Sequence, residues 1–255
     1  ADLIIAISNQ TKQDIIDFFS IDEQKIRVIY QGCNQLFQKI LCKNDLDIIL
    51  KKYKLPKKFL LYVGTIEERK NLLTLLESIN ELPNQRLVII GEGKSYKQKC
   101  ERFISKNSLS KRVFFLKNIS LKDMASIYQS ADIMIYPSIF EGFGIPILEA
   151  LFSKTPVITS KGGCFQEAGG PNSKYINPLS SIEIKEAIIK IQKDHKIKKI
   201  MQEKGFKGKY YVMNSAGGAL TFEMAAAKPI STIFSGPAGG VSGALDLAKI
   251  MKKKK

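Results

Sequence analysis

The sequence predicts an α/β protein with a doubly wound parallel sheet. Short apolar runs rich in Ile, Val and Leu alternate along the chain with segments of helical periodicity. The runs are apolar at consecutive positions, which is typical of strands buried on both faces of a sheet. The 255-residue chain is 44% hydrophobic and 25% charged, a globular composition with room for one large or two modest domains. Together these observations predict parallel strands joined by crossover helices.

The expected elements follow one another regularly from residue 59 onward. Each strand is a run of apolar, β-prone residues, and the later helices open at Asn, Ser or Pro. The expected strands are 3–7, 26–30, 59–63, 87–90, 113–116, 133–136 and 156–159. The expected helices are 11–19, 71–81, 96–107, 121–130, 146–153 and 181–192.

The chain is expected to have three parts. Residues 1–40 contain a strand, a helix and a strand without partners in their own stretch, which indicates the remnant of a preceding α/β domain and its linker. Residues 41–207 carry the regular alternation. Near 207–212 the composition changes, and 208–255 form a foreign-looking Gly/Ala-rich tail that we do not expect to be an independent domain.

The net charge of +16 does not predict nucleic-acid binding. Of the 40 basic residues only five are Arg, the residue that reads most bases and phosphates. The lysines are scattered without interleaved aromatic residues, which favours a solvated lysine-rich surface. The charge is also compatible with an anionic small substrate or an acidic membrane surface.

Several other classes of site are not predicted. The four cysteines form no CxxC pair, so we expect reduced, mostly buried thiols and no metal site. His195, the only histidine, lies in the lysine-rich stretch DHKIKK and is expected on the surface. The longest apolar runs are far too short to span a membrane and no signal peptide is evident, which predicts a cytoplasmic protein.

The segment IIGEGKSY, residues 89–96, imitates a phosphate-binding loop. A P-loop needs Gly five positions before Gly93, where this chain has Val88, and the dinucleotide fingerprint needs Gly at the position of Tyr96. We therefore expect a tight strand-to-helix turn near a ligand crevice, with Ser95 as the helix cap.

The strongest local signal is YPSIFEGFGIPILEALFSKTPVITS, residues 136–160. A strand ends at Tyr136, Gly142 and Gly144 allow close backbone approach in the loop, and Pro146 can open a helix. This arrangement predicts an anion site at a helix N-terminus, at the sheet edge where open α/β sheets bind ligands.

Two carboxylates frame this segment. Glu141 lies on the loop and Glu149 in the expected first helical turn, so both can face the crevice. Two interpretations remain open from the residues alone. The pair contacts a ligand, or Glu149 complements the helix dipole while Glu141 caps the loop.

The segment EGFGIPILE is similar to the E-x7-E signature of family-4 (group 1) glycosyltransferases, retaining enzymes with the GT-B fold that use nucleotide-sugar donors. YVGTIEERKNL resembles that family's donor-phosphate loop, RLVIIGEG its next strand and turn, VFFLKNISLKDMASIYQSADIMIYPS its base-side loop and helix, and TPVITS the following strand. Order and spacing agree over residues 1 to about 206. The resemblance implies a Rossmann-like GT-B C-terminal domain.

The resemblance also implies roles for charged residues. Arg69 and Lys70 match the basic pair that neutralises the donor pyrophosphate, and Glu141 matches the carboxylate facing the donor sugar. We take these three as the catalytic candidates. Glu149 matches the carboxylate that accepts hydrogen bonds from the ribose hydroxyls.

The other implied substrate-binding residues lie in loops. The backbone of 143–144 lies against sugar and phosphate, and the main chain of 117–118 meets the base. The phosphate loop departs from many members, which carry Arg after its Gly where this chain carries Thr. These residues are Gly64, Thr65, Lys117, Asn118, Phe143 and Gly144.

The implied function is a retaining, hexosyltransferase-type glycosyltransferase that moves a sugar from a nucleotide diphosphate to a glycan or lipid-linked acceptor in cell-envelope polysaccharide biosynthesis. The resemblance implies no metal or other cofactor, because the leaving phosphate deprotonates the acceptor. It also implies a cytoplasmic enzyme, compatible with peripheral association at the inner membrane face. Because residues 1–40 match only the end of the acceptor domain, we expect this chain to bind nucleotide and transfer little sugar alone.

Two alternatives remain. One is a non-catalytic nucleotide-sugar binding module. The other is a hydantoinase-like ATPase fragment, because residues 212–250, around SGPAGGVSGA, resemble a segment of hydantoinase/oxoprolinase proteins.

Overall fold

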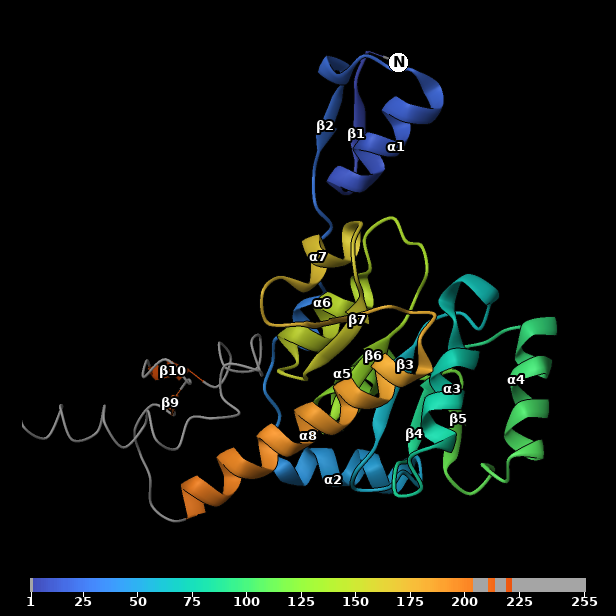
Figure 1. Cartoon of the computed structure of the whole chain (residues 1–255), viewed down its shortest axis with the longest axis vertical. Coiled ribbons are helices and arrows are strands. Elements are labelled where there is room, and N and C mark those ends of the chain that lie inside the picture. The colour runs from blue at the N-terminus through green and yellow to red at the C-terminus, as the bar shows by residue number, and fades with distance from the viewer. Residues whose placement is uncertain (1, 204–210, 214–218, 222–255) are drawn as a thin grey trace, which may run out of the picture. The chain divides into compact units, whose positions relative to one another are not determined.

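A computed structural model describes residues 2–203, 211–213 and 219–221 (Figure 1). The chain divides into two compact units, one up to Ile191 and one from Gln192 onward. The first unit holds the main sheet. In the second, β9 (Tyr211–Met213) and β10 (Ala219–Thr221) form an antiparallel pair. The rest of the Gly/Ala-rich tail and the side chain of His195 lie outside the described residues, so the expectations for them stay untested.

The main sheet has six strands in the order β5-β4-β3-β6-β7-β8, all parallel. Chain order runs outward from β3 in one direction and then restarts at β6 in the other, so the order reverses between these two central strands. This confirms the doubly wound sheet and places its switch point at β3 and β6. The strands are β3 (Leu60–Val63), β4 (Leu87–Ile90), β5 (Val113–Leu116), β6 (Ile133–Tyr136), β7 (Val157–Ser160) and β8 (Lys174–Ile176).

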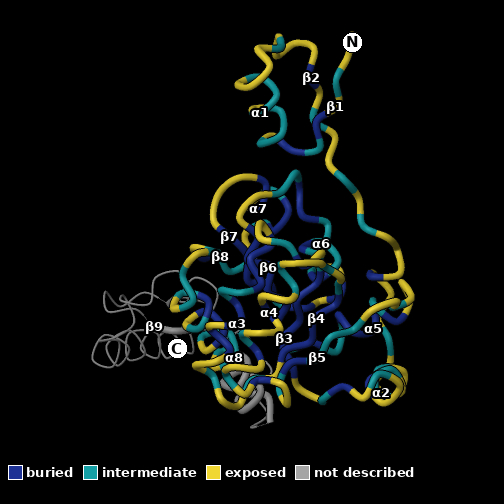
Figure 2. The backbone as a smooth tube through the Cα atoms, turned by 90° about the vertical axis from the view of Figure 1, so that its right-hand side faces the viewer, coloured by how far each residue is buried: buried dark blue, intermediate teal, exposed yellow. Residues whose placement is uncertain are grey.

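Successive residues of a strand point to opposite sides of the sheet, so these apolar strands expose apolar residues on both faces. Helices cover both faces. Leu60 and Tyr62 belong to one apolar core, and Leu61 and Val63 to the other. Figure 2 shows the central strands buried between partly exposed helices. One face carries α3 (Leu72–Asn80), α4 (Ser95–Lys106) and the part of α8 (Ser181–Glu203) up to Ile191. The other carries α2 (Lys43–Lys52), α5 (Leu121–Ser130), α6 (Ile145–Phe152) and α7 (Cys164–Gly169).

The N-terminal segment forms a small β-α-β unit. Strand β1 (Ile4–Ala6) pairs in parallel with β2 (Ile26–Val28), and α1 (Asn9–Phe19) connects them. The expectation that these strands lack partners in their own stretch is therefore wrong. A crossover helix of 11 residues is long enough to return the chain beside its first strand.

Beside the short 3-10 helices, three elements among residues 2–191 were not expected. Helix α2 has a polar, lysine-rich sequence, α7 spans only six residues between glycines, and β8 is a three-residue edge strand. Each is too short or too polar to give a clear apolar period. The expected cap at Ser95 is also wrong. Lys94 occupies the N-cap position without a side-chain bond, and Ser95 is the first helical residue.

The turn at 91–93 fits closely against the loop that follows β3. A Cβ on Gly91 would lie 1.9 Å from the Gly64 carbonyl oxygen, and a Cβ on Gly93 would lie 2.3 Å from that of Ile66. Ile66 and Gly93 also form a parallel bridge. The tight turn is therefore confirmed, and its glycines are required for backbone-to-backbone contact.

We expect Gly91→Ala to lower the free energy of unfolding by at least about 2 kcal/mol, because the backbone of one loop must move to admit the methyl group. Urea denaturation measures the change. Gly32→Ala is the matched control, since a Cβ there meets nothing within 4 Å. Equal midpoints for both variants would show that the two loops can separate without cost.

Candidate functional site

The candidate site lies where β3 and β6 end, at the switch point of the sheet. After β3 the chain passes Gly64 and enters a short 3-10 helix, Glu68–Lys70. After β6 it forms the loop 137–144. The two loops are joined, because the Ile139 N–H donates to the Arg69 carbonyl at 2.7 Å and Arg69 Nη1 donates to the Phe140 carbonyl at 3.1 Å.

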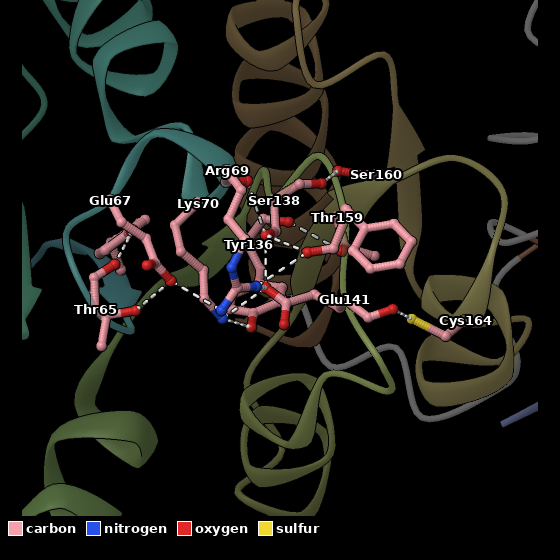
Figure 3. Close-up of polar contacts among 12 residues, drawn as sticks. Thr65, Glu67, Arg69, Lys70, Tyr136, Ser138, Glu141, Thr159, Ser160 and Cys164 are labelled. Atoms are coloured by element: carbon pink, nitrogen blue, oxygen red, sulfur yellow. Dashed lines mark hydrogen bonds and ion pairs between the residues drawn. The ribbon is translucent and has the colours of Figure 1, made fainter. Parts of the chain in front are cut away.

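Three donors converge on one oxygen of Glu141 (Figure 3). Lys70 Nζ lies 2.5 Å from Glu141 Oε1, and Arg69 Nη1 lies 3.0 Å from it. The Ser138 hydroxyl donates to the same oxygen at 2.6 Å. The structure therefore brings together the three residues expected to be catalytic, and Glu141 bridges the two cations.

Lys70 and Glu141 form a buried ion pair. Their side chains are only 9% and 10% exposed. Lys70 Nζ also donates to the Tyr136 hydroxyl at 2.6 Å and lies 4.9 Å from the centre of that ring. A buried charge is tolerated when a partner and hydrogen bonds replace its water. Each member of this pair therefore depends on the other.

The surroundings keep the Glu141 carboxylate ionised. Burial alone would raise the pKa of the Glu141 carboxyl, but its bonds to Lys70, Ser138 and Arg69 hold that pKa below its ordinary value. Burial and the nearby Glu141 charge raise the pKa of Tyr136, so its phenol stays protonated.

Arg69 lies at the open side of the cluster, with 46% of its side chain exposed. Its second arm, Nη2, lies 2.8 Å from Glu67 Oε1, which also accepts the Thr65 hydroxyl at 2.8 Å. Two cations and two carboxylates therefore balance one another. An incoming anion competes with carboxylates that already hold these cations.

Glu149 occupies a different environment from Glu141. It is the fifth residue of α6, so the expectation of a first-turn position is wrong, and with it the interpretation that it complements the helix dipole. Glu149 Oε2 accepts the hydroxyl of the buried Tyr128 at 2.8 Å. Burial raises the pKa of Glu149, and the Tyr128 bond offsets only part of this effect. The two carboxyl pKa values are thus displaced in opposite directions.

The remaining predicted residues lie in loops at the same edge. Gly144 has a φ of 100° at the N-cap of α6, and Phe143 is buried with its ring stacked on Tyr30 at 5.6 Å. Lys117 and Asn118 are exposed directly after β5. Since β5 lies three strands from β6, about 14 Å at ordinary strand spacing, the site suits an extended ligand.

Residues that no motif had indicated complete the cluster. Ser138 follows β6 by two positions, and polar residues just beyond a strand end are a signal that could have identified it. Tyr136 and Tyr128 are buried, and no sequence pattern distinguished them from other residues of the expected strand and helix. Cys164 was expected only as a buried thiol, yet it donates to the Glu141 carbonyl at 3.1 Å.

The cysteines are less buried than expected. All four are free, but only Cys100 and Cys164 are buried, while Cys33 is half-buried and Cys42 is exposed. Cys33 and Cys42 lie in the loop-rich segment between β2 and α2, outside the main sheet.

Comparison with known proteins adds to this geometry. A sequence profile of the family "Glycosyl transferases group 1" matches residues 47–208, and one of "Hydantoinase/oxoprolinase" matches residues 187–255. O-antigen chain mannosyltransferase RfbU of Salmonella typhimurium is 31% identical over 69% of this chain and 46% of that protein. O-antigen chain mannosyltransferase B of Escherichia coli is 26% identical over 80% of this chain and 55% of that protein. The chain thus spans about half the length of the relatives it matches.

Solved structures share the fold. Anabaena Alr3699/HepE in complex with UDP and glucose has a TM-score of 0.70 and 21% identity, covering 77% of this chain and 55% of that one. The C-terminal domain of a glycosyl transferase group 1 family protein (LpcC) from Francisella tularensis has a TM-score of 0.54 and 25% identity, covering 65% of this chain and 90% of that one. Within the described residues, no helix is long and apolar enough to cross a membrane.

We expect Glu141→Gln to lower the free energy of unfolding by about 3–5 kcal/mol at pH 7, because Lys70 loses its buried counter-charge. Since folding lowers the Glu141 pKa, its stabilisation is present above the ordinary value of 4.5 and is lost as pH falls through the lower folded value. The stability gap between the two proteins should therefore stay constant from pH 8 to 6 and shrink in acid.

Glu67→Gln is the control for Glu141→Gln, because Glu67 also pairs with Arg69 but is 44% exposed. It should cost less than about 1 kcal/mol. Denaturation at a series of pH values measures both variants. Equal costs at pH 7 would contradict the buried pair.

Glu149→Gln should stabilise the protein at neutral pH. Because folding raises the Glu149 pKa, the ionised form destabilises the fold above that value, whereas Gln is neutral and can still accept the Tyr128 bond. We expect a melting temperature about 2–4 °C higher at pH 7.5, a change of about 1 kcal/mol. The gain should vanish as pH falls and Glu149 itself becomes protonated. A lower melting temperature at pH 7.5 would contradict this electrostatic account.

Proposed function

The chain belongs to the glycosyl transferases group 1 family, and from this premise we propose that it is the donor-binding part of a retaining glycosyltransferase. The reaction moves a hexose from a nucleotide diphosphate to a hydroxyl of a glycan or lipid-linked acceptor. One observation carries the proposal. At the switch point of the sheet, Glu141 bridges Arg69 and Lys70, so two cations lie close enough together to bind one diphosphate.

Donor binding exchanges partners within this cluster. The donor diphosphate approaches from the open side, where the half-exposed Arg69 meets it first, and Lys70 reaches it from beneath. Glu141, which shared its charge with both cations, then accepts hydrogen bonds from hydroxyls of the sugar. In this exchange Lys70 gains a new anionic partner and Glu141 gains hydrogen bonds, so neither buried charge is left without polar partners.

The nucleoside end is bound further along the sheet edge. Glu149 accepts the ribose hydroxyls, and its ionised form is the stronger acceptor. The main chain of Lys117 and Asn118 meets the base. The backbone of Phe143 and Gly144 lies along the sugar and phosphate, and that of Gly64 and Thr65 along the diphosphate.

In the transfer step, the anomeric carbon's bond to the diphosphate oxygen breaks while the acceptor oxygen bonds to the same face. The acceptor proton passes to the leaving phosphate. Arg69 and Lys70 stabilise the negative charge that grows on that phosphate. This route uses the donor's own phosphate as base and assigns no part to a metal or other cofactor.

The relatives guide the choice of donor and acceptor. The names of two O-antigen mannosyltransferases favour mannose and a cell-envelope polysaccharide acceptor, and the HepE complex favours UDP with glucose. We place the reaction at the cytoplasmic face of the membrane. A non-catalytic sugar-nucleotide module would bind the same donors without turnover.

Isothermal titration with nucleoside, nucleoside diphosphate and nucleotide sugar, in the uridine and guanosine series, tests the assignment. We expect Arg69→Ala to weaken the diphosphate about tenfold or more and leave the nucleoside unchanged. Glu149→Gln should weaken nucleoside and diphosphate alike, by ten- to a hundredfold, since a bond to a charged group contributes about 1.5–3 kcal/mol.

Arg102→Ala, on the exposed side of α4, is the matched control and should change no affinity. Uniform losses across all three ligands for Arg69→Ala, or no binding of any nucleotide by the unmodified chain, would refute the assignment. Turnover of a bound donor with glycan acceptors separates the enzyme from the binding module.

A further inference from the structure

The loop that carries Glu141 is held from two sides through its backbone. The Glu141 carbonyl accepts the Cys164 thiol of α7 at 3.1 Å. The next carbonyl, that of Gly142, accepts the hydroxyls of Ser8 at 2.7 Å and Thr11 at 3.2 Å. Consecutive peptide groups of one loop are thus fixed by two different helical segments.

Glu167 connects these two segments directly. Its Oε2 accepts the backbone N–H and the side-chain amide of Asn9, both at 2.8 Å, and its Oε1 accepts the backbone N–H of Gln10 at 3.1 Å. Asn9 and Gln10 open α1, an 11-residue helix, so a carboxylate on α7 satisfies its free N-terminal donors. The partners are 158 and 157 positions apart in sequence.

Packing reinforces these bonds. Ser8, the N-cap of α1, is fully buried, and its hydroxyl accepts the Thr11 N–H at 3.0 Å. A Cβ on Gly142 would lie 2.9 Å from Ile7 Cδ1. The loop therefore packs against the turn between β1 and α1, and the Ile7 side chain would have to move to admit a Cβ at Gly142.

We propose that Glu167, Ser8 and Cys164 form a clasp that docks α1 against the loop 137–144 and so positions Glu141. Glu167 acts through this clasp as a positioning residue. Through the clasp, the N-terminal β-α-β unit fixes the carboxylate that faces the donor sugar. The consequence for the sugar rests on the proposed function, whereas the clasp itself does not.

The charge of Glu167 supports this role. Burial would raise the pKa of Glu167, but its bonds to Asn9 and Gln10 hold that pKa below its ordinary value. The carboxylate thus stays ionised against the helix N-terminus.

Amide hydrogen exchange of the full chain tests the clasp without any ligand. In Glu167→Ala, we expect the amides of Asn9 and Gln10 to exchange at least tenfold faster, and those of the loop 137–144 to follow. Glu167→Gln, which retains a neutral acceptor, should be intermediate. Glu183→Gln is the matched control, because Glu183 also accepts a backbone N–H, that of Asn177 at 2.9 Å, away from this loop.

Titration then tests the consequence for the donor. In Glu167→Ala we expect the nucleoside diphosphate to bind within about twofold of the unmodified chain and the nucleotide sugar to bind about tenfold more weakly. Glu167→Gln should recover part of that loss. A purely structural role would weaken both ligands equally.

Unchanged exchange at Asn9 and Gln10 in Glu167→Ala would overturn the clasp. If Asn9 and Gln10 exchange faster but the exchange of the loop 137–144 or the affinity for the nucleotide sugar is unchanged, Glu167 does not position Glu141. If the unmodified chain binds no nucleotide sugar, the proposed function fails, and exchange of the loop still decides whether the clasp holds it.

Discussion

The burial of Lys70 is the constraint on which the rest of the site depends. A buried ammonium group needs an anion and further acceptors, and Glu141 and Tyr136 supply them. Lys70 follows β3, whereas Tyr136 ends β6 and Glu141 lies on the loop beyond it. Neutralising one lysine therefore requires the two central strands to end side by side, with their loops in one register. The charge pairing of Lys70 therefore depends on the order of the strands in the sheet.

Glu141 on the loop and Glu149 on α6 differ in the environment and the pKa of their carboxyl groups. Glu141 is bonded to two cations, which lower its pKa, while Glu149 on α6 has the Tyr128 phenol as its hydrogen-bond partner, and burial raises its pKa. Different environments at the two ends of E-x7-E suit different tasks, one among charges and one against neutral hydroxyls. Spacing alone does not reveal this difference, because it depends on residues contributed by β6, α5 and the loop after β3.

Elements with a strong apolar pattern were predictable from sequence, and contacts between distant segments were not. The runs at 87–90 and 133–136 coincide with strands that are buried on both faces, and the run at 113–116 coincides with the partly covered edge strand β5. Helix α2 and strand β8 were missed because their apolar period is weak. The resemblance identified the residues of the cluster. It did not indicate that Glu141 and Lys70, which lie 71 residues apart, are bonded to each other. Glu167 lies in a stretch where no local pattern indicates a role.

The contact between Gly64 and Gly91 has an evolutionary consequence. The fit is made by the Gly64 carbonyl against the Gly91 backbone, so the side chain that follows Gly64 takes no part in it. Thr65 is exposed at that position. Under the proposed function, a substitution there changes how the diphosphate is recognised while the backbone fit beneath it is kept, so the ligand preference can diverge by single exchanges without compensating changes in the core.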